Sequence, residues 1–384
     1  MAAFAVLCFV VAARGDEPAA VVSNKGIESL LAPIHEKHKT PGLIAGVVGP
    51  QGLASVGAVG VRKLGSPEPL LVTDKIHLGS DTKAMTATRL AMLVAEGKLA
   101  WTATLGEVFA DLKPRLHTDF AGVTLEQLLT HRSGLPANAN YRKFTSGSLV
   151  EQREALTREV LAQRPQHPPG TKFLYSNVGY IVAGHVAERV TGQSWETLMT
   201  EGLFKPLAMS SAGFGVPGTI GQVDQPWGHV SLLGISVPRQ DDNPALLGPA
   251  GTVHCSLADW AKFVSLHLRA GRGEPIGRGR ENAERDQGSG FRIQVLLRPE
   301  MFKTLHTPPP GERYAFGWGI AERPYITGPL LMHSGSNTMW LATVAISPRH
   351  NIAFLVAANS ADDAAHQACD AALAALATRE DLSR

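Results

Sequence analysis

Residues 77–97 read HLGSDTKAMTATRLAMLVAEG, a glycine-serine turn that leads into an apolar run. Apolar residues recur there at three- and four-residue spacing, which predicts a helix from Ser80 to Gly97. Ser80 and Lys83 then share one helix face, about 5–6 Å apart at Cβ. A buried lysine can take the proton of a serine hydroxyl, and the free N–H groups of a helix start suit an oxyanion. The alternative is that Ser80 only caps the helix.

Strand patterns lie on both sides of this helix. Gly42 to Val61 is rich in Val, Ala, Leu, Ile and Gly, with a turn at its middle, and predicts a β-hairpin. Late candidate strands cover Phe316–Ile320, Leu341–Ile346 and Ile352–Ala357. Further helices are predicted between and after them, at Thr124–Thr130, Asn177–Thr191, Ser194–Leu203 and Asp362–Leu376.

This order of elements predicts an α+β fold with three layers, α/β/α. We expect a mostly antiparallel sheet, flanked by helices and built from both chain ends, with a helical insertion and an active site between the two parts. The sheet layer is expected at about 20–78 and 291–384 and the helical part at about 80–270, within one domain over 20–384.

Two further motifs follow the serine and lysine along the chain. Tyr175-Ser176-Asn177 offers a phenol that can exchange a proton and an amide that can orient a lysine or a substrate. His333-Ser334-Gly335 lies in the late strand region and is followed by Ser336. The triplet His77-Leu78-Gly79 has the same H-x-G form, so this third element carries little information in isolation.

Taken in this order, the motifs resemble those of the serine β-lactamase and penicillin-binding-protein family, nearest its class C, family VIII esterase and D-aminopeptidase branch. Segments around them agree, including Leu128–Pro136 and Pro249–Gly251, and the resemblance spans roughly Ile27 to Ala377. It implies a β-lactamase/transpeptidase-like fold. It also implies a serine hydrolase that works through an acyl-enzyme, with no cofactor and no metal.

The resemblance assigns catalytic roles to three residues. Ser80 would be the acylated nucleophile, Lys83 its base or proton relay, and Tyr175 the group that exchanges a proton with the attacking or leaving atom. Whether Lys83 or Tyr175 is the working base stays open at this point.

It assigns substrate binding to Asn177, His333, Gly335 and Ser336. Asn177 would position Lys83 and the substrate. The backbone N–H groups of Ser80 and of Ser336, expected on an edge strand, would form the oxyanion hole.

His333 departs from the class C pattern, which has a lysine at the head of this triplet. A histidine with an ordinary pKa near 6.5 is largely neutral at pH 7, so it attracts a substrate carboxylate weakly. This favours cleavage of an ester or amide, including a D-amino-acid peptide bond. The alternatives are a β-lactamase or D,D-carboxypeptidase, and a catalytically silent module that binds cell-wall fragments.

Composition narrows the range of partners. Lys+Arg 36 against Asp+Glu 34 gives a net charge of +2, which excludes a strong field for nucleic acid and leaves a small molecule or peptide as the expected substrate. The three cysteines are widely spaced, so Cys255 and Cys369 are expected to be buried thiols rather than a bridge. Residues 35–38, HEKH, have the wrong spacing for a zinc motif.

Two further segments bear on the location of the protein and on its surface. Residues 1–15 have the apolar run of a signal peptide, which predicts a periplasmic or secreted protein whose mature chain is not stably inserted in a membrane. Residues 271–290 mix glycine with equal numbers of acidic and basic residues, which predicts a mobile surface loop. The oligomeric state is left open.

Overall fold

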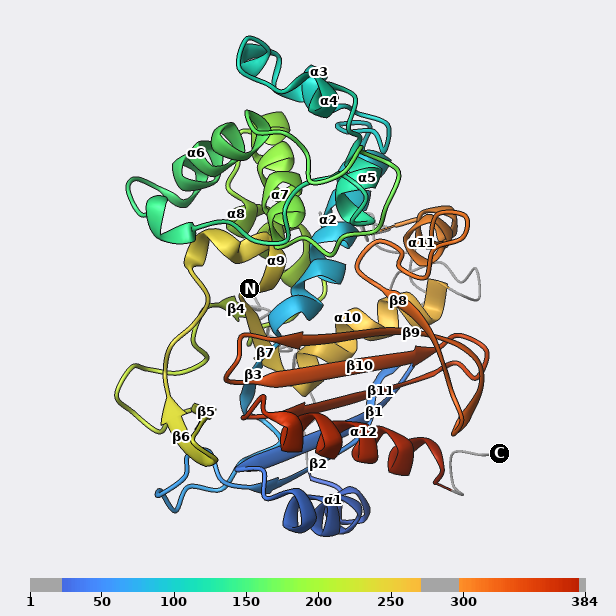
Figure 1. Ribbon diagram of the computed structural model, residues 1–384. Coiled ribbons are helices and arrows are strands. Elements are labelled where there is room, and N and C mark those ends of the chain that lie inside the picture. The colour runs from blue at the N-terminus through green and yellow to red at the C-terminus, as the bar shows by residue number, and fades with distance from the viewer. Residues whose placement is uncertain (1–22, 271–296, 380–384) are drawn as a thin grey trace, which may run out of the picture.

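A computed structural model describes residues 23–270 and 297–379, with a sheet layer below a cluster of helices (Figure 1). The expected signal peptide and the expected loop at 271–290 lie outside the described residues.

The central sheet has six strands in the order β2-β1-β11-β10-β9-β8, and every neighbouring pair is antiparallel. Early and late segments meet in it, because Leu43 of β1 pairs with Ala358 of β11. The strands are β1 (Gly42–Gly49), β2 (Gly52–Gly60), β8 (Gly319–Arg323), β9 (Ile326–Ser336), β10 (Leu341–Ser347) and β11 (Ile352–Ala358).

Both faces of this sheet are buried, so β1, β10 and β11 read as nearly unbroken apolar runs. Alternate side chains enter different cores. Leu43, Phe354 and Val356 pack under helices α1 (Lys25–His38) and α12 (Asp363–Ala377), whereas Ile44 and Leu355 join the larger core with helix α10 (Leu257–Ala270). These are the three layers expected from the sequence, and the fold is α+β.

Helix α2 (Thr82–Ala95) runs from the sheet into the helical part (Figure 1). Its residues from Thr82 to Leu93 are all buried, which explains why its sequence has only a weak polar face. The helices around it are α3 (Leu105–Val108), α4 (Thr118–Ala121), α5 (Leu125–Leu129), α6 (Leu149–Leu161), α7 (Asn177–Thr191), α8 (Trp195–Met199), α9 (Gly248–Gly251) and α11 (Pro299–His306).

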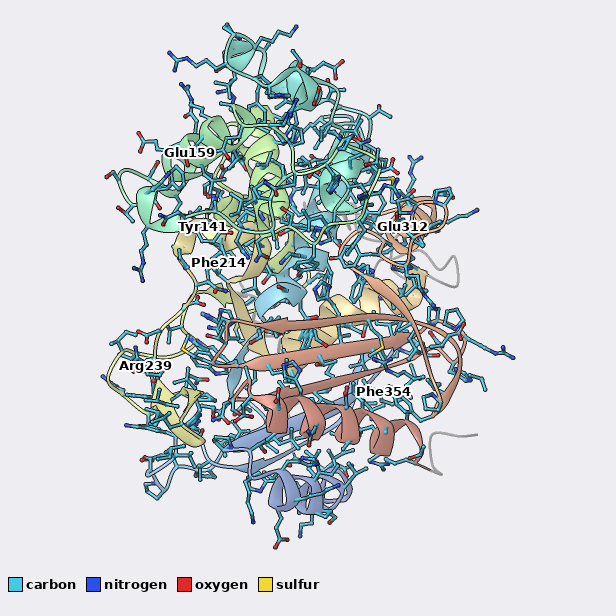
Figure 2. All side chains as sticks on the ribbon, viewed as in Figure 1. Tyr141, Glu159, Phe214, Arg239, Glu312 and Phe354 are labelled. Carbon is cyan, nitrogen blue, oxygen red and sulfur yellow. The ribbon has the colours of Figure 1, made fainter. Side chains whose placement is uncertain are left out.

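Two smaller sheets lie outside the central sheet. One joins β3 (Lys75–His77), β7 (Val253–Ser256) and β4 (Gly213–Phe214). The other is a hairpin of β5 (Gly228–Leu232) and β6 (Ile235–Arg239), where Arg239 lies at the side of the molecule (Figure 2).

Three details of the sequence interpretation were wrong. The strand expected at Phe316–Ile320 starts at Gly319, because Gly317 turns at φ +88 directly against Ala84. Strand β9 was not predicted as a unit. The helix expected at Ser194–Leu203 is α8 followed by a π-helical turn, Thr200–Phe204.

Cys255 and Cys369 are buried free thiols in different cores, on opposite faces of the sheet. Over 23–270 and 297–379, no helix combines the length and apolarity needed to cross a bilayer. The same residues contain no cluster of three or more His, Cys, Asp or Glu side chains placed to hold a metal ion.

Candidate active site

Ser80 lies in a short 3-10 turn, Gly79–Asp81, that precedes α2. The turn is anchored on the small sheet, because the Leu78 N–H donates to the carbonyl of Val253 at 2.8 Å. Gly79 adopts a φ of +49, a conformation that favours glycine. Ser80 is partly exposed, so its hydroxyl is reachable while the turn beneath it is buried.

The turn packs backbone against backbone on the end of β9. A Cβ on Gly79 would lie 2.3 Å from the Ser336 nitrogen, and a Cβ on Gly335 would lie 2.5 Å from the Ser80 nitrogen. Both positions therefore require glycine, and the two glycines bring the amides of Ser80 and Ser336 to one place. The geometry supports this role for Gly335: it lets the backbone of β9 approach the Ser80 turn closely.

The end of β9 is open on this side although β9 is not an edge strand of the sheet. It lies between β10 and β8, which corrects the expectation of an edge position for Ser336. The pairing with β8 stops at Met332, however, so residues 333–336 are paired with β10 only. The strand therefore has a local edge that faces Ser80.

Lys83 is completely buried one turn below Ser80. Its Nζ lies 3.0 Å from Ser80 Oγ, 2.8 Å from Asn177 Oδ1 and 2.7 Å from the Ala250 carbonyl. Burial lowers the pKa of Lys83 from 10.5 to about 7, against the opposing effect of the Asp81 carboxyl. A neutral Lys83 is thus accessible at physiological pH.

The Asp81 carboxyl is also buried, and it interacts with the backbone N–H of Gly335. Burial raises its pKa well above the usual value, although the nearby Lys83 favours the charged form. A protonated Asp81 beside a neutral Lys83 avoids a buried charge at either group.

Tyr175 and Asn177 are held by the start of α7. Ser176 caps this helix, with its hydroxyl accepting from the Gly179 N–H at 2.8 Å, and Asn177 is the first helical residue. Asn177 accepts from Lys83 through Oδ1 and donates through Nδ2 to Asn138 Oδ1 at 2.9 Å. Its amide orientation is therefore fixed at both ends.

His131 fixes the backbone on either side of Tyr175. Its carbonyl accepts from the Leu174 N–H at 2.8 Å, and its Nδ1 accepts from the Ser176 N–H at 3.0 Å. The ring also packs on Tyr175, with 4.3 Å between centroids. Burial holds the pKa of His131 well below 6.5, so it stays a neutral acceptor. These contacts give His131 a structural role, because they hold the backbone on both sides of Tyr175.

His333 is buried opposite Lys83. Its Nδ1 lies 2.6 Å from the Gly317 carbonyl, which places the ring proton on Nδ1, and its Nε2 lies 3.4 Å from the Tyr175 hydroxyl. Burial lowers the pKa of His333 to about 4, while the Gly317 contact acts in the opposite direction. His333 is therefore neutral at pH 7. Burial also raises the pKa of Tyr175 well above 10, so the phenol keeps its proton.

The structure thus brings together Ser80, Lys83, Tyr175, Asn177 and His333, with the backbone of Gly335 and Ser336 beside them. Sequence reasoning missed Asn138, the Ala250 carbonyl and Asp81 as neighbours of the site; only Ala250 had a signal, within the Pro249–Gly251 segment.

Two features of the surroundings do not belong to the group of candidate residues. Trp340 is fully buried behind the third motif, against His77. A surface pocket of about 400 Å³ lies elsewhere, between Gln127, Arg132 and Pro309, and contains none of the candidate residues.

The site combines a serine and a lysine one helical turn apart with a tyrosine and a strand end, at the junction of sheet and helices. This combination defines a class of serine-dependent proteins. The sequence profile of the Beta-lactamase family matches residues 27–379, and the chain belongs to this family.

Individual relatives extend this finding. The chain is 25% identical over 344 residues to "Unguisins hydrolase ungD" of Aspergillus violaceofuscus, covering 84% of this chain and 59% of the relative. It is 29% identical over 287 residues to "Protein flp" of Staphylococcus aureus, covering 75% of this chain and 53% of the relative. The chain thus spans little more than half the length of these curated relatives.

A solved structure, D-alanine carboxypeptidase AmpC from Burkholderia cenocepacia, superposes with a TM-score of 0.69 at 21% identity. The match covers 92% of this chain and 98% of that one, and it shows the shared fold.

Proposed function

We propose that this protein is a serine hydrolase that cleaves an ester or amide bond, including a D-amino-acid peptide bond, through an acyl-enzyme on Ser80. The observation that carries the proposal is the environment of Lys83. Two of its three partners, Asn177 Oδ1 and the Ala250 carbonyl, can only accept hydrogen bonds. A neutral amine donates to both and directs its lone pair at the third partner, Ser80 Oγ.

In the first step, Lys83 takes the hydroxyl proton of Ser80 while Oγ forms a bond to the substrate carbonyl carbon. The carbonyl π electrons move to oxygen, where the N–H groups of Ser80 and Ser336 stabilise the oxyanion. Tyr175 then passes a proton to the leaving oxygen or nitrogen and is reprotonated from Lys83. The carbon–leaving-group bond breaks, and the acyl-enzyme remains.

Water completes the cycle by the reverse proton path. It loses a proton toward Tyr175 and Lys83 as its oxygen attacks the ester carbon, and Ser80 Oγ leaves with a proton returned from Lys83. The raised pKa of Tyr175 supports Lys83, rather than a Tyr175 phenolate, as the base.

The charge at the site supports a substrate without a required carboxylate. His333, at the head of the third motif, is neutral, and its Nδ1 is engaged by the Gly317 carbonyl. The name of the Aspergillus relative, a hydrolase, agrees with hydrolytic activity.

The test is turnover of three substrate types, p-nitrophenyl esters, D-aminoacyl p-nitroanilides and nitrocefin, by wild type and by Ser80→Ala. We expect ester or anilide cleavage that falls by about 10⁴-fold or more in Ser80→Ala. The control is Ser231→Ala, on the exposed end of β5. Equal rates in wild type and Ser80→Ala contradict the proposal, and a folded wild type inactive on all three favours the silent binding module.

Rapid nitrocefin hydrolysis by the wild type would instead support a β-lactamase, and cleavage of a D-alanyl-D-alanine peptide a carboxypeptidase. Both kinds of enzyme cleave an amide bond in a substrate that carries a carboxylate, and a neutral His333 attracts that carboxylate weakly. His333→Lys is therefore expected to gain acylation by benzylpenicillin. Export to the periplasm or medium stays a prediction, and the mass of the mature protein from its native host tests it.

A further inference from the structure

The triplet His77-Leu78-Gly79 lies directly beneath the nucleophile. Its histidine has no role among the catalytic residues described above. His77 ends strand β3 and is completely buried. Its Nδ1 accepts a hydrogen bond from the Gly79 N–H at 3.1 Å. This contact spans the turn that presents the Ser80 amide, one of the two proposed oxyanion donors.

The other ring nitrogen of His77 contacts an acidic residue from a distant segment. Because Nδ1 accepts a hydrogen bond, the ring hydrogen is on Nε2. Nε2 lies 2.8 Å from Asp242 Oδ1, although the N–H is not well aligned with it. The same oxygen also accepts a hydrogen bond from the Asn243 N–H at 2.6 Å.

The same Asp242 oxygen reaches the residue next to the second oxyanion donor. Asp242 Oδ1 accepts from Asn337 Nδ2 at 3.0 Å, and Asn337 directly follows Ser336. Asn337 is itself buried, and its Oδ1 accepts from the N–H groups of Met339 and Trp340 at 3.2 and 3.1 Å. It therefore fixes the turn that ends β9 and sets the position of the Ser336 amide.

We infer that Asp242 is a positioning residue that ties the two halves of the oxyanion hole together. One carboxylate oxygen links His77, under the Ser80 turn, to Asn337, beside Ser336. The two amides come from segments more than 250 residues apart in the sequence, so their separation depends on such a link. This inference rests on the proposed function, because it assigns a role within the same reaction.

The alternatives predict different kinetics. An acidic side chain that contacts the substrate would affect KM, and a purely structural one would affect the melting temperature. A link that positions the oxyanion donors acts on kcat, because these donors act most strongly in the transition state.

The experiment compares Asp242→Ala, Asp242→Asn and the matched control Asp241→Ala. Asp241 is the neighbouring acidic residue, and it pairs with Arg239 on the surface, where both side chains are more than half exposed. For Asp242→Ala we expect kcat to fall by roughly 10- to 100-fold, the cost of misplacing reacting groups by about 1 Å, with little change in KM. Asp242→Asn should recover most of the rate, because its amide oxygen can accept from Asn337 Nδ2 and lie against His77 Nε2 as the carboxylate does.

A second variant breaks the link from the other end if Asp242→Ala does not fold. Asn337→Asp keeps the acceptor for Met339 and Trp340 but places a carboxylate against Asp242, and it should lower kcat to a similar extent. Combined with Asp242→Ala it should cost no more than either change alone.

Several outcomes overturn the inference. They are an unchanged kcat in both Asp242→Ala and Asn337→Asp, an effect confined to KM, or an Asp242→Asn variant as slow as Asp242→Ala. A wild type that turns over no substrate and has an unreactive Ser80 overturns the proposed function together with this inference. An active wild type with a fully active Asp242→Ala overturns only the role of Asp242.

Discussion

Two buried basic groups belong to this site, Lys83 beside Ser80 and His333 beside Tyr175, and burial lowers the pKa of both. The pKa of Lys83 falls from 10.5 to about 7, whereas that of His333 falls from 6.5 to about 4. The lysine therefore exchanges a proton near neutral pH, and the histidine does not.

Their partners sharpen the contrast. Lys83 contacts two obligate acceptors and the Ser80 hydroxyl, so losing a proton leaves its lone pair directed at the nucleophile. His333 uses one nitrogen on the Gly317 carbonyl and turns the other toward the Tyr175 hydroxyl. Burial thus makes Lys83, on the helix side, a base that works near neutral pH. It makes His333, on the sheet side, a neutral hydrogen-bonding group.

The largest expected effect comes from removing the base. Lys83→Met fills a similar volume without a proton acceptor, and we expect kcat/KM to fall by about 10²- to 10⁴-fold. Steady-state kinetics on the best substrate measures it, with circular dichroism as the check on folding. Lys98→Met, at a largely exposed lysine, is the control. A Lys83→Met variant with wild-type kinetics would remove the lysine from the mechanism.

The pH dependence of the rate separates the two bases directly. Only neutral Lys83 accepts a proton, so kcat/KM should fall about tenfold per pH unit below about 7 and reach a plateau above it. Tyr175 keeps its proton through pH 10, so it adds no descending limb below that pH. A rate that is flat between pH 5 and 8 would contradict this assignment.

His333→Gln tests the histidine side. A rate transition near pH 7 is usually attributed to histidine, whose ordinary pKa is about 6.5. Here the transition should keep its midpoint near 7 in His333→Gln, because it belongs to Lys83. The glutamine amide can still donate to the Gly317 carbonyl, so only a modest loss of rate is expected. Disappearance of the transition would assign it to His333.

The smallest effect is on stability in acid. Burial lowers the pKa of His254, His306 and His333 from 6.5 to about 4. Between these values the unfolded chain binds more protons, so the unfolding free energy is fully present above about pH 6.5 and falls as the pH decreases toward 4. Urea titrations across this range measure the slope. His306→Gln should make it shallower and the exposed His350→Gln should not; identical slopes in wild type and His306→Gln would contradict the account.

The sequence predicted those parts of the molecule that depend on local pattern. Helix α7 has the predicted bounds, and β10 and β11 extend one residue past theirs, because apolar periodicity and caps define them. Strand β9 was missed because Gly328 and Pro329 interrupt its pattern, and the Phe316 segment was misread because Gly317 turns to pack on Ala84.

The residues around Ser80 also fall into two groups, those that sequence motifs identify and those that only the fold brings close. Ser80, Lys83, Tyr175, Asn177 and His333 could be selected from motifs and their order along the chain. Asn138 and Asp242 could not, because their contacts join segments whose proximity only the fold creates. The burial that lowers the pKa of Lys83 is likewise a property of the packed helix, not of the motif.

Covalent labelling of Ser80 tests the central claim most directly. Wild type and Ser80→Ala would be incubated with a fluorophosphonate and, separately, with benzylpenicillin, and intact masses and peptide maps recorded. The account predicts one phosphonyl adduct on Ser80 in wild type, none at that position in Ser80→Ala, and no accumulated penicilloyl adduct. A folded wild type that stays unlabelled, or one labelled only at another residue, would contradict an acyl-enzyme on Ser80.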